Sequence, residues 1–134
     1  MVYARIVLIL TGLIYLAFGI FFLVAPEQAA TIVSYWLGGP TAFTEARAFY
    51  GGLEIGLAAF LTVCAGVRRF VPVGLLAVLL LCGGTAAARL VGMVVDESRS
   101  TVVLVSLATE LVVAALAATA LWRVGLRPPG GTQR

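Results

Sequence analysis

Four long apolar segments run along the chain, and short polar or proline-containing stretches separate them. They cover roughly residues 5–24, 44–66, 71–95 and 101–123. Each segment is long enough to cross a hydrocarbon core of about 30 Å, which takes about 20 residues of α-helix. The pattern predicts an all-α protein with four transmembrane helices.

The connections between these segments indicate how the helices are arranged. Residues 26–40, PEQAATIVSYWLGGP, contain Tyr35 and Trp36, which are typical of the membrane surface. They predict a short interfacial helix between the first two spans. The later links, GVRRFVP and DESRS, are short enough to make neighbouring helices antiparallel, which predicts an up-down bundle. Residues 1–124 are expected to form one domain and residues 125–134 a flexible cytoplasmic tail.

Composition supports a membrane location and removes several functions. Hydrophobic residues make up 62% of the chain, against roughly 45–50% in soluble domains. The net charge of +3 is too small and too scattered to favour nucleic acid. Without histidine, the chain lacks the commonest ligand of zinc and haem sites, so we expect no metal and no cofactor. Cys64 and Cys82 are expected at different depths, as free thiols.

The arginines predict the orientation of the bundle. In a four-span arrangement one side carries six of them: Arg5, Arg68, Arg69, Arg123, Arg127 and Arg134. The opposite side carries mostly acids: Glu27, Glu45, Asp96 and Glu97, with Arg47 and Arg99. Positive charge collects on the cytoplasmic side of membrane proteins. We therefore expect a multi-pass protein of the bacterial inner membrane with both termini in the cytoplasm.

Ionisable side chains also occur inside the predicted spans. Glu54, Arg89 and Glu110 all fall in the outer half, and each belongs to a polar stripe at helical spacing. A charge at the bilayer centre costs at least about 2.5 to 3.5 kcal/mol, so these stripes should face the bundle interior. We expect Glu54 and Glu110 to surround Arg89, in a network that opens outward through three further residues: Arg47, Tyr50 and Asp96.

Glycines in two of the spans indicate close helix packing. Gly52 and Gly56 form a G-x-x-x-G motif, which brings helix backbones together in membranes. Gly12 and Gly19, with Tyr15 between them, are expected to pack in the first span.

The motif around the second span resembles a known family. E-x-R-x-x-Y-G-G-x-E-x-G begins at Glu45 and ends at Gly56, and Arg89, Gly92, Asp96 and Glu110 follow in later spans. This order resembles small bacterial four-helix membrane proteins catalogued as domain of unknown function 4345, which are distantly similar to DoxX-like proteins. The resemblance implies a fold and a membrane location, and it brings no reaction with it.

Three functions remain open. The first is an outer-half pocket that binds or transforms a small lipophilic molecule with a polar head. The second is a non-catalytic subunit or assembly partner, in which the Arg and Glu residues only hold helices together. The third is a small proton-coupled transporter, which ranks last because the first span has no acidic residue. Apart from the lipid bilayer, the partner is a small ligand, a second copy or a larger membrane complex.

Overall fold

The structure, a computed structural model, describes residues 1–125 and contains no strand among them. Four helical spans are long and apolar enough to cross a membrane: α1 (Val2–Val24), the run from α3 to α4 (Pro40–Gly66), the run from η2 to α5 (Arg68–Val95) and α6 (Thr101–Val124). The predicted all-α fold with four spans is confirmed. Apart from Gly125, the predicted flexible tail lies outside the described residues.

Two of these spans are composed of more than one kind of helix. The second consists of α3 (Pro40–Ala46), a π-helical segment η1 (Arg47–Gly52) and α4 (Leu53–Gly66). The third begins with a 3₁₀ turn, η2 (Arg68–Phe70), and continues as α5 (Val71–Val95). A short helix, α2 (Pro26–Ile32), connects the first span to the second. Prolines open α2, α3 and α5, because proline fixes the backbone angle that the first helical turn needs.

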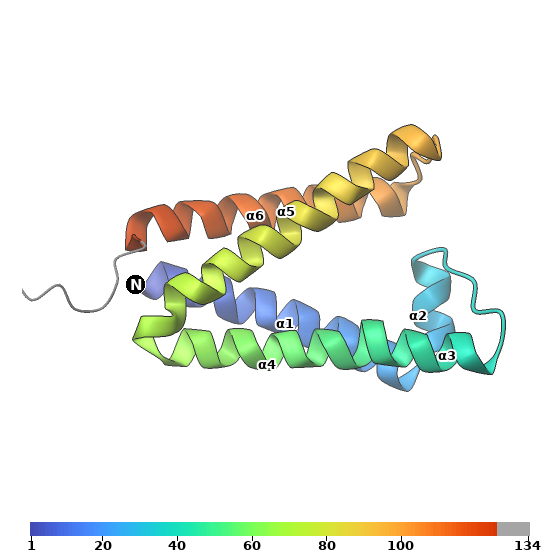
Figure 1. The fold of residues 1–134 in the computed structure, drawn as a ribbon, viewed down its shortest axis with the longest axis horizontal. Helices are drawn as coiled ribbons and strands as arrows, with labels where there is room; N and C mark the ends of the chain where they lie inside the picture. Colours follow the sequence, from blue (N-terminus) through green and yellow to red (C-terminus); the bar gives the residue numbers. More distant parts are fainter. Residues whose placement is uncertain (126–134) are drawn as a thin grey trace, which may run out of the picture.

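The long helices form two antiparallel pairs (Figure 1). In one pair α1 lies along α4, and in the other α5 lies along α6. Met1, η2 and Val124 lie at one end of the bundle, which we call the terminal end. At the opposite end, the loop end, lie α2 and the turn of residues 96–100. The predicted up-down bundle is confirmed, with the difference that the two pairs diverge toward the loop end.

The main hydrophobic core joins all four long helices on the terminal side of the bundle. Its fully buried members include Leu8 of α1, Leu61 of α4 and Leu75 of α5. Ala117 and Ala120 are the only buried residues of α6 within 101–124. The last buried residue of α5 is Ala86. Burial therefore holds α5 and α6 to the rest of the bundle over the terminal half alone.

A second, smaller core lies at the loop end and belongs to one helix pair. It consists of buried residues of α1, α2 and α3: Phe22, Ala29, Ala30 and Ala46. No residue of α5 or α6 takes part in it. Because each pair is packed separately at this end, the fold leaves space between the pairs.

The connection between the first two spans differs in detail from the predicted interfacial helix. In Figure 1, α2 crosses the direction of α1, as a helix at a membrane surface does. It ends at Ile32, so Tyr35 and Trp36 lie in the following loop. Trp36 is 86% exposed at the loop end, and Trp122 is 85% exposed near the end of α6. Exposed tryptophans at both ends are typical of the two interfaces of a membrane span.

Close contact between α1 and the second span depends on glycine. A Cβ atom at Gly19 would lie 2.9 Å from the carbonyl oxygen of Gly51 and 3.0 Å from Cβ of Glu54. At Gly12 a Cβ atom would lie 3.5 Å from the Ala58 carbonyl oxygen. The predicted packing of Gly12 and Gly19 is therefore confirmed: Gly19 meets Gly51 on the second span, and Gly12 meets Ala58.

The G-x-x-x-G motif of the second span does not make this contact. Nothing within the described residues lies within 4 Å of a Cβ atom placed at Gly56, and Gly52 meets only the Arg47 carbonyl oxygen of its own span. Gly52 and Gly56 therefore pack against no other helix within residues 1–125, and their role in helix packing stays a prediction. Successive helical residues are about 100° apart, so a helix that rests on Gly51 leaves Gly52 on another face.

Substitution of the two kinds of glycine tests this packing. We expect Gly19→Ala to lower the free energy of unfolding by about 1 to 3 kcal/mol, because the new methyl group meets backbone at Gly51. Gly56→Ala, the matched control, should leave stability unchanged or raise it by about 0.5 to 1 kcal/mol, because alanine favours helix. Unfolding in detergent micelles measures both. A larger loss in Gly56→Ala would contradict the assignment.

Candidate functional site

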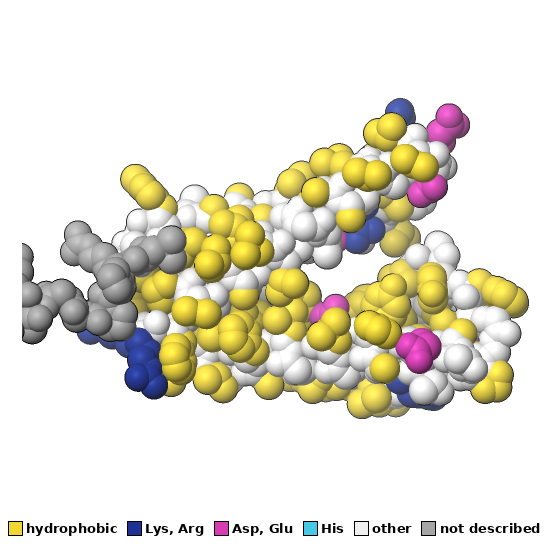
Figure 2. All heavy atoms as spheres, in the orientation of Figure 1, with side chains coloured by type: hydrophobic (Ala, Val, Ile, Leu, Met, Phe, Trp, Pro, Cys, Tyr) yellow, Lys and Arg dark blue, Asp and Glu magenta, His cyan; other side chains and the backbone are white. Residues whose placement is uncertain are grey.

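A cleft separates the two helix pairs at the loop end. Figure 2 shows it as a gap between the α1/α4 pair and the α5/α6 pair, with acidic atoms on one wall and basic and acidic atoms on the other. The gap follows from the packing, because α5 and α6 take no part in the loop-end core. In a bilayer such a cleft lies among lipid tails, so the polar side chains on its walls need polar partners.

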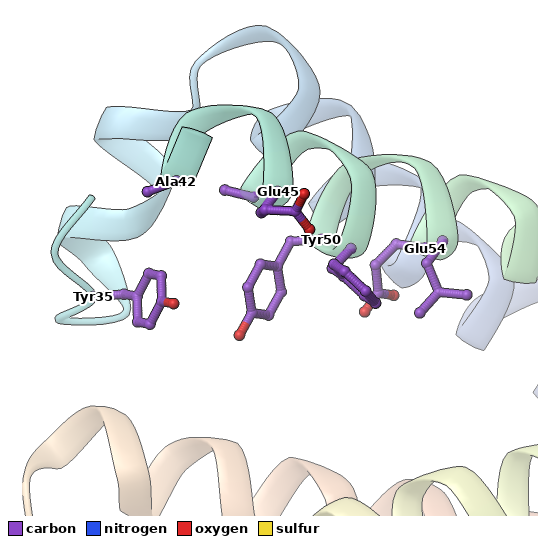
Figure 3. A pocket seen from close by; sticks show the side chains of 8 residues that line it. Tyr35, Ala42, Glu45, Tyr50 and Glu54 are labelled. Carbon is purple, nitrogen blue, oxygen red and sulfur yellow. The ribbon is translucent and has the colours of Figure 1, made fainter. Parts of the chain in front are cut away.

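A pocket of about 530 Å³ lies on the α3–α4 wall of this cleft. Its lining includes Tyr35, Glu45, Phe49, Tyr50, Leu53 and Glu54. In Figure 3, Tyr35, Tyr50 and Glu54 point into the space between this wall and the facing helices. The second span thus supplies most of the pocket, and the loop after α2 supplies Tyr35.

The π-helical segment η1 sets the positions of these side chains. The N–H group of Leu53 bonds to the carbonyl oxygen of Ala48, five residues back, where an α-helix would bond four residues back. Such π-bulges occur mostly at functional sites. Gly52 at its end was interpreted from the sequence only as part of a packing motif with Gly56, so the sequence analysis missed the π-turn.

Aromatic rings support the pocket from behind. The rings of Phe22 and Tyr50 lie 4.8 Å apart, and those of Tyr35 and Tyr50 lie 6.1 Å apart in an edge-on arrangement. Phe22 is fully buried in the loop-end core, so it fixes the position of Tyr50. Tyr50 was a predicted site residue, and the structure places it in the pocket. Tyr35 was expected only as a surface anchor.

The facing wall holds an ion pair inside the membrane span. Arg89 of α5 donates two hydrogen bonds to Glu110 of α6, from Nε to Oε2 at 3.1 Å and from Nη2 to Oε1 at 2.7 Å. Paired bonds of this kind are the strongest contacts between arginine and a carboxylate. The side chains are 31% and 16% exposed, so the pair remains open to the cleft. The predicted contact between Arg89 and Glu110 is confirmed.

Glu54 does not join this pair. No salt bridge links it to Arg89 among the described residues, and its Oε2 atom is buried without a hydrogen-bond partner there. The expected three-membered network is therefore wrong in this respect. The physical reason is the divergence of the helix pairs, since Glu54 belongs to one pair and Arg89 to the other. About 14 residues separate Glu54 from the start of α3, which puts it roughly 20 Å along the span.

Arg47 has a different position from the predicted one. Its Nε atom donates a hydrogen bond of 3.1 Å to the carbonyl oxygen of Leu23, in the last turn of α1. The final carbonyl groups of a helix lack partners within the helix, and a positive charge there is favourable. Arg47 is also absent from the lining of the pocket. It holds the end of α1 to the second span, and the expectation that it opens the network outward is not met.

Asp96 also lies away from the pocket. It is the exposed residue that follows α5, and its N–H group bonds to the carbonyl oxygen of Gly92 at 2.8 Å. No ion pair forms at its side chain within residues 1–125. The predicted stripe from Arg89 to Asp96 thus leads from the cleft to the loop end without a polar contact between the two.

The closed end of the cleft contains a polar contact that sequence analysis missed. The hydroxyl oxygen of Tyr15 on α1 lies 3.6 Å from the sulfur of Cys82 on α5. Cys82 precedes Arg89 by seven residues, a spacing that puts both on one helix face and could have indicated the contact. Both cysteines are free, as predicted.

The ion pair has a measurable signature in a double-mutant cycle. Arg89→Ala should cost about 3 to 5 kcal/mol of stability, because it leaves the Glu110 carboxylate buried and alone. Adding Glu110→Gln should recover part of that loss, whereas adding Glu54→Gln should not. Chemical unfolding of the single and double variants in detergent supplies the energies. Equal recovery by both glutamine variants would contradict the separate position of Glu54.

Comparison with known proteins gives one finding. A family model described as Domain of unknown function (DUF4345) matches residues 3–121. No curated protein and no solved structure matches the chain. The matched range contains all of α1 to α5 except Val2, nearly all of α6, and every residue of the cleft described above. The chain therefore belongs to the DUF4345 family, as its motif around Tyr50 and Glu54 predicted.

Proposed function

We propose that this protein binds a small lipophilic molecule whose polar head group lies in the cleft beside Glu54. The observation that carries the proposal is the buried Oε2 atom of Glu54, which has no hydrogen-bond partner among residues 1–125. A buried polar atom without a partner costs free energy, and inside a membrane water does not readily supply one. A ligand with a hydrogen-bond donor or a positive charge supplies the missing partner.

The facing wall supports the same proposal. Arg89 uses Nε and Nη2 on Glu110, and a guanidinium group carries further N–H donors. Its partial exposure leaves these donors available to the cleft. A carboxyl group close to a fixed arginine is also suited to general acid or base work, so the site is compatible with a reaction as well as with binding.

The surroundings of the pocket suit a lipophilic molecule. Phe49 and Leu53, which line it, are 62% and 63% exposed. Side chains of this kind meet lipid tails in a bilayer, so a hydrocarbon chain can lie against them while the head group reaches Glu54. The pocket volume is in the range of small-molecule sites, about 300 to 1,000 Å³.

A second function, that of an assembly partner in a larger membrane complex, has one observation in its favour. Helix α6 buries only Ala117 and Ala120, so most of its surface faces away from the rest of the chain. A neighbouring membrane protein could cover this surface. In that case the bond between Arg89 and Glu110 only fixes the α5/α6 pair, and the cleft has no ligand.

We further propose that the protein lies in a bacterial inner membrane with both termini in the cytoplasm. The terminal end carries four arginines of the described chain, Arg5, Arg68, Arg69 and Arg123, whereas the loop end carries Arg47 and Arg99. The loop end carries four acids: Glu27, Glu45, Asp96 and Glu97. The positive-inside rule then puts the cleft in the outer half of the bilayer.

Cysteine labelling in intact cells tests the orientation. Ser98→Cys, in the turn between α5 and α6, should react with an impermeant thiol reagent added from outside. Val67→Cys, beside η2, should react only after the cells are opened. Cys64 and Cys82 are buried and serve as the unreactive background. The reverse labelling pattern would place the cleft in the cytoplasmic half and overturn this part of the proposal.

Native mass spectrometry of protein taken from its own membranes tests the binding function. We expect the wild type to retain a small non-protein adduct, and Glu54→Gln to lose most of it because the carboxylate partner is gone. Thr109→Val is the matched control, since the Thr109 hydroxyl bonds to the Val105 carbonyl oxygen of its own helix. Protein subunits in place of a small adduct would favour the assembly-partner function instead.

A further inference from the structure

The pocket on the α3–α4 wall has an acidic and aromatic lining. Two of its side chains are carboxylic acids, Glu45 and Glu54, and three are aromatic, Tyr35, Phe49 and Tyr50. No arginine lines it. The two acids belong to the same span and are nine residues apart, or roughly 13 Å along it. Glu45 lies nearer the loop end and Glu54 farther along the second span, and we call this pair of pocket acids the acidic path (Figure 3).

The two arginines close to this path have other partners. Arg47 donates to the Leu23 carbonyl oxygen at the end of α1, and the Glu110 carboxylate compensates the charge of Arg89. Glu54 therefore has no counter-charge of its own among the described residues. An anionic head group beside Glu54 would meet a like charge, whereas a cationic one would compensate the charge of the ionised carboxylate.

The aromatic rings of the pocket also favour a cationic ligand. A cation within about 6 Å of a ring centroid is attracted to the ring face, and tyrosine is a favourable partner. The Tyr35 and Tyr50 rings lie edge-on with their centroids 6.1 Å apart, and both rings line the same pocket. Phe22 holds Tyr50 from behind, which fixes the position of this ring before a ligand arrives.

We propose that the ligand is a lipophilic organic cation, an amine or quaternary ammonium with an apolar body. This inference rests on the proposed binding function and specifies the class of its ligand. The positive group sits between Glu54 and the two tyrosine rings, and Glu45 attracts it at the mouth of the path. The apolar body lies against Phe49 and Leu53, toward the lipid.

Two probes of the same shape and opposite charge test this directly. Tetraphenylphosphonium is a lipophilic cation, and tetraphenylborate is an anion of the same form. Equilibrium binding of each is measured with the full chain in neutral detergent, with empty micelles subtracted. We expect saturable binding of the cation at least tenfold tighter than that of the anion.

Substitutions then connect the preference to named residues. Glu54→Gln should weaken cation binding at least tenfold, and Glu54→Asp, which keeps the charge, should retain part of it. Tyr50→Phe keeps the ring and should bind nearly as the wild type does, whereas Tyr50→Leu should bind severalfold more weakly. Thr109→Val is again the control. Thermal unfolding of each variant separates a lost ligand contact from a lost fold.

The outcomes distinguish this inference from the function on which it rests. Tighter binding of the anion, or equal binding of both probes, would overturn the cation preference while leaving a ligand site in the cleft. A cation preference that persists in Glu54→Gln would overturn the role of Glu54. If neither probe saturates and the native protein carries no small adduct, both the inference and the binding function are wrong.

Discussion

The cost of placing charge inside a membrane governs this structure. Glu54, Arg89 and Glu110 lie within helices that otherwise consist mostly of apolar residues, and each must find a partner or a polar cavity. Arg89 and Glu110 satisfy each other across the α5/α6 pair. Glu54 belongs to the α1/α4 pair, and its Oε2 atom has no hydrogen-bond partner among the described residues. The proposed binding function rests on this one unmatched carboxylate in the middle of a span.

The distribution of packing explains why Glu54 stays unmatched. Small residues bring α1 and the second span into close contact, and the main core joins all four long helices at the terminal end. At the loop end the buried hydrophobic core belongs to α1, α2 and α3 and contains no residue of α5 or α6. The helix pairs are consequently held together at one end and separate at the other. A bundle packed evenly along its length would have closed Glu54 against Arg89 and left no pocket.

Much of this architecture could be predicted from the sequence, because the apolar segments match the length of a membrane span so closely. The pair of Arg89 and Glu110 also followed from depth and helical spacing.

Three features of the structure could not be predicted from the sequence. The π-turn at Arg47–Gly52 has no clear sequence signal, and it changes which residues of the second span face α1. Arg47 bonds to the end of α1, a contact that depends on the path of residues 25–39. The divergence of the pairs depends on where burial ends along α5 and α6, which periodicity alone does not reveal.

The central claim is that Glu54 stands apart from the Arg89–Glu110 pair and faces an open site. Solid-state NMR in lipid bilayers can measure it through carbon–nitrogen dipolar couplings, with ¹³C in the glutamate carboxyl groups and ¹⁵N in the arginine side chains. We expect a strong coupling between the Glu110 carboxyl carbon and the Arg89 guanidinium, and none between Glu54 and Arg89. Comparable couplings from Glu54 and Glu110 would show a closed structural network and contradict the account.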